Sequence, residues 1–149
     1  MVLGEQQREY WWCAVVDPIQ ITVQIPAMQL AKPGITQKVD AALRQAAYSA
    51  EAVAKRSLAE PKTGTLYKRG NIIHQASAPG EPPAMDTGLL ANSISTTAEG
   101  SLRYVVSASA HYAIYLEYGT YKMAARPFMR PAFEQVKPGF LEAIARALR

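Results

Sequence analysis

The sequence predicts an α+β domain, in which a small antiparallel sheet is packed by one long alanine-rich helix and a kinked C-terminal helix. Three observations predict it. Apolar and polar residues alternate in two short segments, an alanine-rich segment repeats apolar residues every three or four positions, and a second such repeat ends the chain. Strands mixed with two helices are typical of α+β folds, and 149 residues suffice for one domain with a real core.

Two short segments are predicted to be strands. In residues 19–25, isoleucine or valine alternates with glutamine or threonine, and this pattern of β-branched residues predicts a half-buried strand that ends at Pro26. Residues 102–109 alternate in the same way and predict a second strand. The apolar stretch 10–16 fits either another strand or an extension arm, and 89–94 fits the start of a short helix or a strand.

Two longer segments are predicted to be helices. The first begins at Thr36, whose hydroxyl can cap it, and stops before Pro61. Its apolar face comprises Val39, Leu43, Ala46, Ala47, Ala50, Val53, Ala54 and Leu58. Alanine on this face lets a neighbouring helix or sheet approach closely. The second helix covers 128–148, where Pro138 and the glycine after it predict a kink or two helical pieces.

Residues 62–87 are rich in proline and glycine and predict a long projecting loop or an irregular hairpin, in which only Ile72 and Ile73 resemble a strand. A loop of this length is usually functional. Neither flank is large enough to stand alone, so we expect a single domain overall. Within it, 1–35 is an N-terminal strand or arm region and 36–149 is the domain proper.

Composition argues against a metal, a cofactor or a membrane span. The single cysteine, Cys13, excludes an internal disulfide and a cysteine-based zinc cluster, and two histidines, His74 and His111, are too few for a metal site. The longest apolar run, 10–16, is far shorter than the roughly 18 residues of a membrane span, and acidic residues before it disfavour a signal peptide. We expect a soluble protein made in the cytosol.

Two triplets associated with enzymes lack their usual surroundings. The Asp-Thr-Gly at 86–88 matches the aspartic-protease triplet, but prolines precede it where a buried strand is required. We interpret it as a turn in which Asp86 caps the following segment. The Lys-Thr-Gly at 62–64 resembles a triplet of penicillin-recognising enzymes, but no Ser-x-x-Lys precedes it to supply the nucleophile. We therefore predict no catalytic residues and no enzymatic activity.

Basic side chains form two groups, each interleaved with a tyrosine. The first is Lys55, Arg56, Lys62, Lys68 and Arg69 with Tyr67, and the second is Lys122, Arg126 and Arg130 with Tyr121. The formal net charge of +4 is mild, and no nucleic-acid-binding module is recognisable, so a dedicated DNA-binding role is the weaker alternative. For Glu117 we prefer an ion pair with Arg126 or Arg130 across a subunit contact.

Three stretches together resemble a known family. They are 63–70 (TGTLYKRG), then 74–83 (HQASAPGEPP) running into 86–94 (DTGLLANSI), and finally 112–120 (YAIYLEYGT) followed by 122–132 (KMAARPFMRPA). In this order they are similar to the tail-component family of lambda-like siphophages, which are neck or tail-completion proteins. The resemblance covers about residues 36–149 and is most specific in the third stretch.

The resemblance implies a structural virion protein without catalytic residues. Members of the family form rings of identical subunits, commonly hexamers, between the head connector or stopper and the tail tube. We therefore expect a ring that joins head to tail and lines the DNA path, with passing contact to genomic DNA, assembled in the host cytoplasm and located in the virion. The alternatives are a tail terminator that caps the tube and, more remotely, a basic DNA-binding packaging factor.

Two sets of residues are expected to make the contacts of such a ring. Tyrosines offer large amphipathic contacts of the kind enriched at interfaces, and Gly119 permits a sharp turn after Glu117. The predicted subunit interface is Tyr112, Tyr115, Glu117, Tyr118, Gly119, Tyr121, Arg126, Phe128 and Arg130. The predicted docking loop is Lys68, Arg69, His74, Pro79, Glu81, Pro82, Pro83 and Asp86. The alternative is a monomer in which the tyrosines belong to the core.

Overall fold

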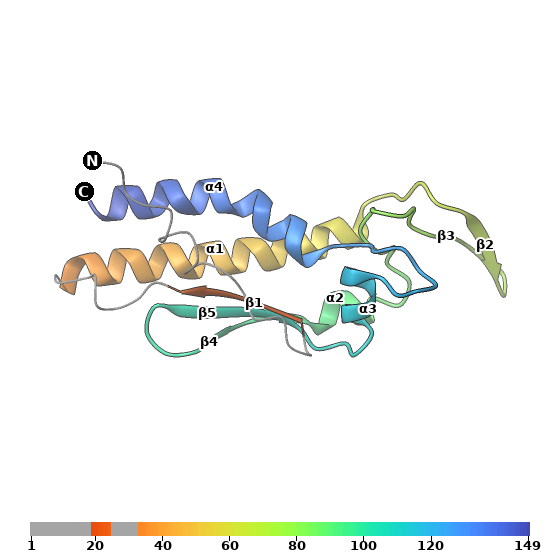
Figure 1. Ribbon diagram of the computed structural model, residues 1–149, viewed down its shortest axis with the longest axis horizontal. Helices are drawn as coiled ribbons and strands as arrows, with labels where there is room; N and C mark the ends of the chain where they lie inside the picture. The colour runs from red at the N-terminus through yellow and green to blue at the C-terminus, as the bar shows by residue number, and fades with distance from the viewer. Residues whose placement is uncertain (1–18, 25–32) are drawn as a thin grey trace.

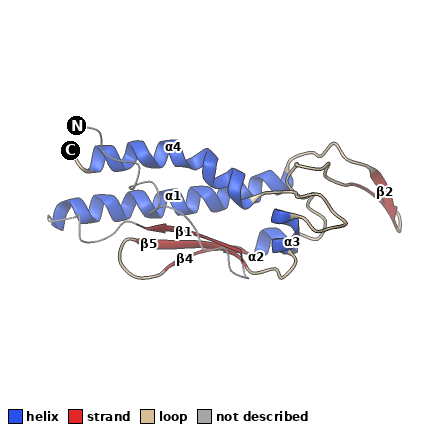
Figure 2. Cartoon of the chain, in the orientation of Figure 1, coloured by secondary structure: helices blue, strands red, loops and turns tan. Residues whose placement is uncertain are grey.

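The computed structural model describes residues 19–24 and 33–149 and confirms the predicted α+β class (Figures 1 and 2). In chain order the elements are β1 (Ile19–Gln24), α1 (Pro33–Ala59), β2 (Leu66–Arg69), β3 (Ile72–Gln75), α2 (Leu89–Ser93), β4 (Ile94–Ala98), β5 (Arg103–Ala108), α3 (Ala113–Tyr118) and α4 (Met129–Ala147). The predictions for the arm at 10–16, for Cys13 and for the strand end at Pro26 lie outside the described residues.

The main sheet has three antiparallel strands in the order β1-β5-β4. Both predicted strands are confirmed as β1 and β5, and Ile19 and Ile94 pair with Ala108 from opposite sides. The central strand β5 buries three consecutive residues, Tyr104, Val105 and Val106. The third strand, β4, begins directly after the short helix α2, so residues 89–93 of the segment 89–94 are helical and Ile94 starts the strand.

The long helix α1 lies between the sheet and α4, so both of its sides are covered (Figure 1). The predicted alanine-rich face is confirmed, since Ala47, Ala50 and Ala54 are buried. Alanine side chains allow the two neighbouring layers to approach closely. The helix begins at Pro33, three residues before the predicted start, so the prediction that Thr36 caps it is wrong.

Two polar contacts tie α1 to the sheet beneath it. The Tyr104 hydroxyl donates to the Asp40 carboxylate at 3.0 Å, and Thr96 donates to Glu51 at 2.6 Å. Burial, together with the bond to Asp40, raises the pKa of Tyr104 above its ordinary value. Each contact pairs a residue of the helix with one on a strand far away in sequence.

The C-terminal helix α4 runs without interruption from Met129 to Ala147, with Pro138 inside it, so it is a single helix and not two pieces. Figure 1 shows a bend in its N-terminal half, as expected for a helix that contains a proline. Phe140 is buried, in the core that α4 shares with α1.

A two-stranded hairpin, β2–β3, projects from one end of the molecule (Figure 1). Of the two alternatives predicted for 62–87, a projecting loop or an irregular hairpin, the structure shows a hairpin, and its strand β2 was not predicted. Gly70 and Asn71 form its turn, and Gly70 has a φ of 62°, which favours glycine. Seven of its eight strand residues are exposed and His74 is half-buried, so the hairpin contributes little to the core.

Candidate functional site

The exposed large hydrophobic residues of the described chain concentrate at the hairpin end of the molecule. Nine lie on the hairpin, on α2 and α3, or on the loops beside them: Leu66, Tyr67, Ile72, Ile73, Met85, Leu89, Tyr115, Tyr118 and Tyr121. Three lie elsewhere: Tyr48, Leu141 and Leu148. Soluble monomers rarely expose large contiguous apolar surfaces, and such surfaces usually mark protein contacts. This end is therefore the candidate interaction site.

Two separate apolar surfaces can be distinguished at this end. We call the first the tyrosine face, which comprises Tyr115, Tyr118 and Tyr121. Tyr115 and Tyr118 lie three residues apart on α3 and so share one side of the helix, and Tyr121 is 92% exposed. The alternative that the tyrosines belong to the core is wrong for these three. It holds in part for Tyr112, which is half-buried and packs against the core.

The second surface is the outer face of the hairpin, which comprises Leu66, Lys68, Ile73 and Gln75. Cross-strand pairing of Leu66 with Gln75 and of Lys68 with Ile73 places these side chains on one face. Ile73 is 70% exposed there. Sequence reasoning missed Leu66 and Ile73. The signal that could have found them is the Gly-Asn pair at 70–71, which is typical of a two-residue hairpin turn between alternating strands.

The opposite face of the hairpin is held to the body of the molecule by Asp86. The carboxylate of Asp86 pairs with Arg69, and its Oδ1 lies 3.6 Å from Nδ1 of His74. His74 also stacks on Tyr67 with a centroid distance of 5.7 Å. The prediction that Asp86 caps the following segment is wrong, because Gly88 precedes α2 and Asp86 bonds to residues on the hairpin instead.

Further corrections apply to the predicted docking loop. The Glu81 carboxylate accepts hydrogen bonds from the Thr63 hydroxyl at 2.6 Å and from the Ala78 amide at 2.8 Å. These bonds, that of the Thr63 hydroxyl first, lower the pKa of Glu81. Glu81 therefore closes the loop on itself, and Pro83 is buried. Lys68 and Pro79 are exposed as predicted, and Pro82 is half-buried.

Glu117, predicted at the subunit interface, is buried inside the chain with 6% of its surface exposed. Its Oε2 accepts the amide N–H groups of Phe128 at 2.8 Å and Met129 at 3.0 Å, and its Oε1 accepts that of Arg130 at 2.9 Å. These amides start α4, where a helix has unsatisfied donors and a partial positive charge. Glu117 is thus a cap supplied from another helix, and the predicted intersubunit ion pair with Arg126 or Arg130 is wrong.

The prediction that Phe128 lies at the subunit interface is also wrong, because its side chain is fully buried inside the chain at 0% exposure. Gly119 makes the turn that returns the chain from Glu117 toward α4, as predicted. Its φ is 76°, and a Cβ there would lie 2.7 Å from the Met123 oxygen and the Ala125 nitrogen. The aromatic and arginine-proline stretch at 112–132 therefore includes an internally bonded loop as well as exposed tyrosines.

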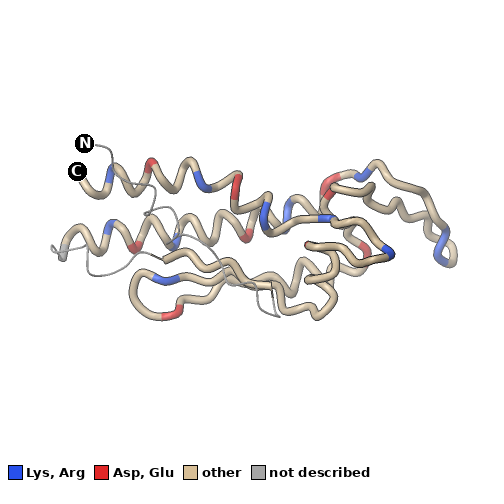
Figure 3. Tube along the Cα trace, viewed as in Figure 1, with Lys and Arg blue, Asp and Glu red and all other residues tan. Residues whose placement is uncertain are grey.

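The first basic group is partly neutralised within the chain, because two of its five cations form ion pairs with carboxylates. Lys55 pairs with Glu51, Arg69 pairs with Asp86, and the buried Lys62 donates to the Ser57 carbonyl at 2.5 Å. Figure 3 shows lysines and arginines interspersed with acidic residues along the trace. Over the described part of the chain, the charges do not form the continuous basic stripe that nucleic-acid binding favours.

No protein-family model, curated protein or solved structure matches this chain. Among residues 19–24 and 33–149, no group of three or more His, Cys, Asp or Glu side chains is placed to hold a metal ion. Within the same ranges, no helix combines the length and apolarity needed to cross a bilayer.

Proposed function

We propose that this protein is a structural subunit of a phage virion, which forms a homo-oligomeric ring at the head–tail interface, joins head to tail and lines the DNA path. The observation that carries the proposal is the pair of separate apolar surfaces at one end of the molecule, the tyrosine face and the outer face of the hairpin. The resemblance of 112–132 to neck and tail-completion proteins supports the phage setting.

Two different surfaces favour a ring over a two-fold dimer. When one surface meets a copy of itself, the contact closes as a dimer, whereas contact between two unlike surfaces repeats around an axis. In the proposed contact, the hairpin of one subunit lies against the tyrosine face of its neighbour. Leu66 and Ile73 supply apolar area, and the Lys68 ammonium can lie over a tyrosine ring.

The first experiment measures the oligomeric state of the purified full chain by sedimentation velocity and native mass spectrometry. We expect a ring for the unchanged chain, and monomers for Ile73→Lys and for Tyr118→Ala. The matched control is Leu141→Lys, which places the same charge on an exposed residue of α4 and leaves the ring intact. A monomeric unchanged chain at high protein concentration, or rings in both interface variants, would refute the proposed contact.

The second experiment removes the protein from the phage genome that encodes it. We expect filled heads and separate tails of normal length, because the joint between them is missing. Tails of abnormal length would assign the protein to the tail terminator position instead. Fully infectious particles in the absence of the protein would exclude both positions.

A further inference from the structure

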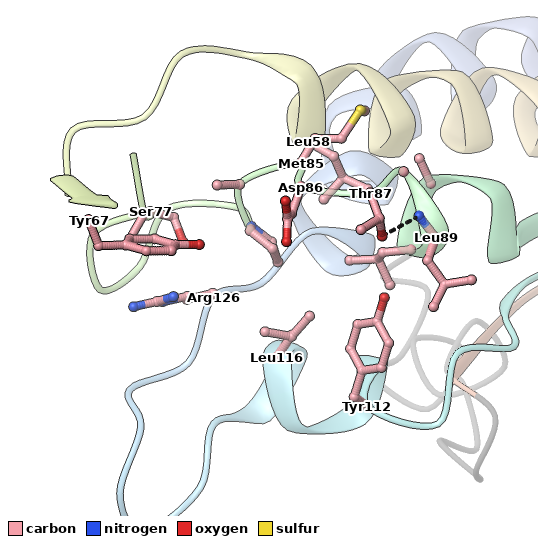
Figure 4. Close-up of a pocket in the computed structure, with 16 residues that line it drawn as sticks. Leu58, Tyr67, Ser77, Met85, Asp86, Thr87, Leu89, Tyr112, Leu116 and Arg126 are labelled. Atoms are coloured by element: carbon pink, nitrogen blue, oxygen red, sulfur yellow. Dashed lines mark hydrogen bonds between the residues drawn. The ribbon is translucent and has the colours of Figure 1, made fainter. Parts of the chain in front are cut away.

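A cavity of about 310 Å³ lies between the base of the hairpin, α2 and α3, apart from the tyrosine face and the outer face of the hairpin (Figure 4). Much of its wall is apolar and includes Leu58, Met85, Leu89 and Leu116. Its volume is at the lower end of the range for ligand sites, and it fits one or two side chains better than a nucleotide.

Two polar groups in this cavity lack a partner in the described chain. Ser77 is 2% exposed, and its hydroxyl has no hydrogen-bond partner. The buried Nε of Arg126 has none either, and no carboxylate of the described residues forms an ion pair with this guanidinium. Figure 4 places Ser77 and Arg126 together at one end of the cavity, beside Tyr67. Buried donors are usually satisfied, so these two indicate a missing acceptor.

The side chains of Ser77 and Arg126 indicate which kind of acceptor this end of the cavity binds. A guanidinium and a hydroxyl in apolar surroundings suit a carboxylate, which a guanidinium binds through paired, charge-assisted hydrogen bonds. Asp86 lines the same cavity but is already paired with Arg69. A nucleic-acid backbone fits less well, because it carries many phosphates, whereas the cavity offers one unneutralised cation and apolar walls.

We propose that this cavity binds an acidic segment of a partner protein. The carboxylate of a glutamate or aspartate lies against Arg126 and Ser77, and an apolar side chain next to it lies against Leu89 and Leu116. Complementary charge at one end and complementary apolar area at the other define this partner. The site does not depend on ring formation, because it uses neither the tyrosine face nor the outer face of the hairpin.

The test titrates the full chain with two capped tripeptides, leucine-glutamate-leucine and leucine-glutamine-leucine, and follows binding by NMR chemical shifts and calorimetry. We expect the glutamate peptide to bind about tenfold more tightly, because only its side chain gives charge-assisted bonds to Arg126. Arg126→Gln should abolish this preference, and Ser77→Ala should weaken glutamate binding severalfold. Arg146→Gln, the same change at the far end of α4, should keep wild-type binding.

Several outcomes would overturn the proposal. These are equal affinity for the two peptides, no saturable binding of either at millimolar concentration, and an unchanged preference in Arg126→Gln. Displacement of the glutamate peptide by inorganic phosphate or a DNA oligonucleotide would make the cavity a phosphate site instead. If Arg126→Gln fails to fold, Ser77→Ala decides the result by itself. Sedimentation of the same samples reports ring formation separately, so the two proposals can fail independently.

Discussion

Removal of the Glu117 carboxylate is expected to destabilise the whole chain, because this group caps α4 from inside the core. Glu117→Ala would leave the amide groups of Phe128, Met129 and Arg130 without their acceptor at the start of α4. A buried donor left without an acceptor costs about 1–3 kcal/mol, so three such amides together cost about 3 kcal/mol or more. We therefore expect the free energy of unfolding to fall by that amount.

The amide variant gives a finer test of the same geometry. In Glu117→Gln, the side-chain oxygen can replace Oε2 and keep the bonds to Phe128 and Met129, whereas its NH2 group would face the Arg130 amide. One bond is lost and the charge is removed, so we expect a loss of about 1–3 kcal/mol. A smaller loss of stability in Glu117→Gln than in Glu117→Ala would show that the hydrogen-bond geometry of the side chain, as well as its charge, stabilises the start of α4.

Urea denaturation followed by circular dichroism measures both losses, and hydrogen exchange of the Phe128, Met129 and Arg130 amides reports the local effect. Glu134→Gln is the matched control on the same helix, because Glu134 forms only a surface pair with Lys137 at 3.7 Å. That change should cost less than about 0.5 kcal/mol. A Glu117→Ala protein as stable as the control, but defective in assembly, would refute the capping role and restore the intersubunit ion pair.

Three further predictions concern backbone and pH. Gly119→Ala should cost about 1–3 kcal/mol in urea denaturation, because φ is 76° and the added Cβ meets backbone atoms, whereas Gly34→Ala has open space and should be neutral. The pKa of Tyr104 is raised in the folded state, so stability should be lost as pH rises above its unfolded pKa of about 10, and Tyr104→Phe should remove this loss. The pKa of Glu81 is lowered in the folded state, so its contribution to stability is present above an ordinary carboxyl pKa and should be lost as pH falls. Urea denaturation at several pH values measures this dependence, which Glu81→Gln should weaken.

The parts of the fold that the sequence predicts are those with a local pattern. The alternation in β1 and β5 and the alanine spacing of α1 repeat within a few residues, so periodicity alone identifies them. Strand β4 lacks such a pattern, because Ile94 is its only buried residue and the remainder is serine, threonine and alanine. Its pairing with β5 makes it a strand, and no local pattern records that contact.

The candidate site was predicted less well, because its decisive contacts join residues that are distant in sequence. Asp86 was assigned to a local cap, yet it bonds to Arg69, which lies 17 residues away along the chain. Glu117 was paired with an arginine by charge, whereas backbone amides 11 to 13 residues later compete more effectively for it. Tyr115 and Tyr118 on α3, and Tyr121 in the loop after it, are exposed, as the predicted interface requires.

The contacts that hold the hairpin lie at its root and on one face. Glu81 fixes its base, Asp86 holds one face through Arg69 and His74, and Leu66, Lys68 and Ile73 on the other face are exposed. These three positions can therefore change during evolution at little cost to folding. Substitutions on the outer face of the hairpin can therefore adapt it to a different neighbouring protein. The contacts of Asp86 and Glu81 would keep the orientation of the hairpin relative to the rest of the molecule.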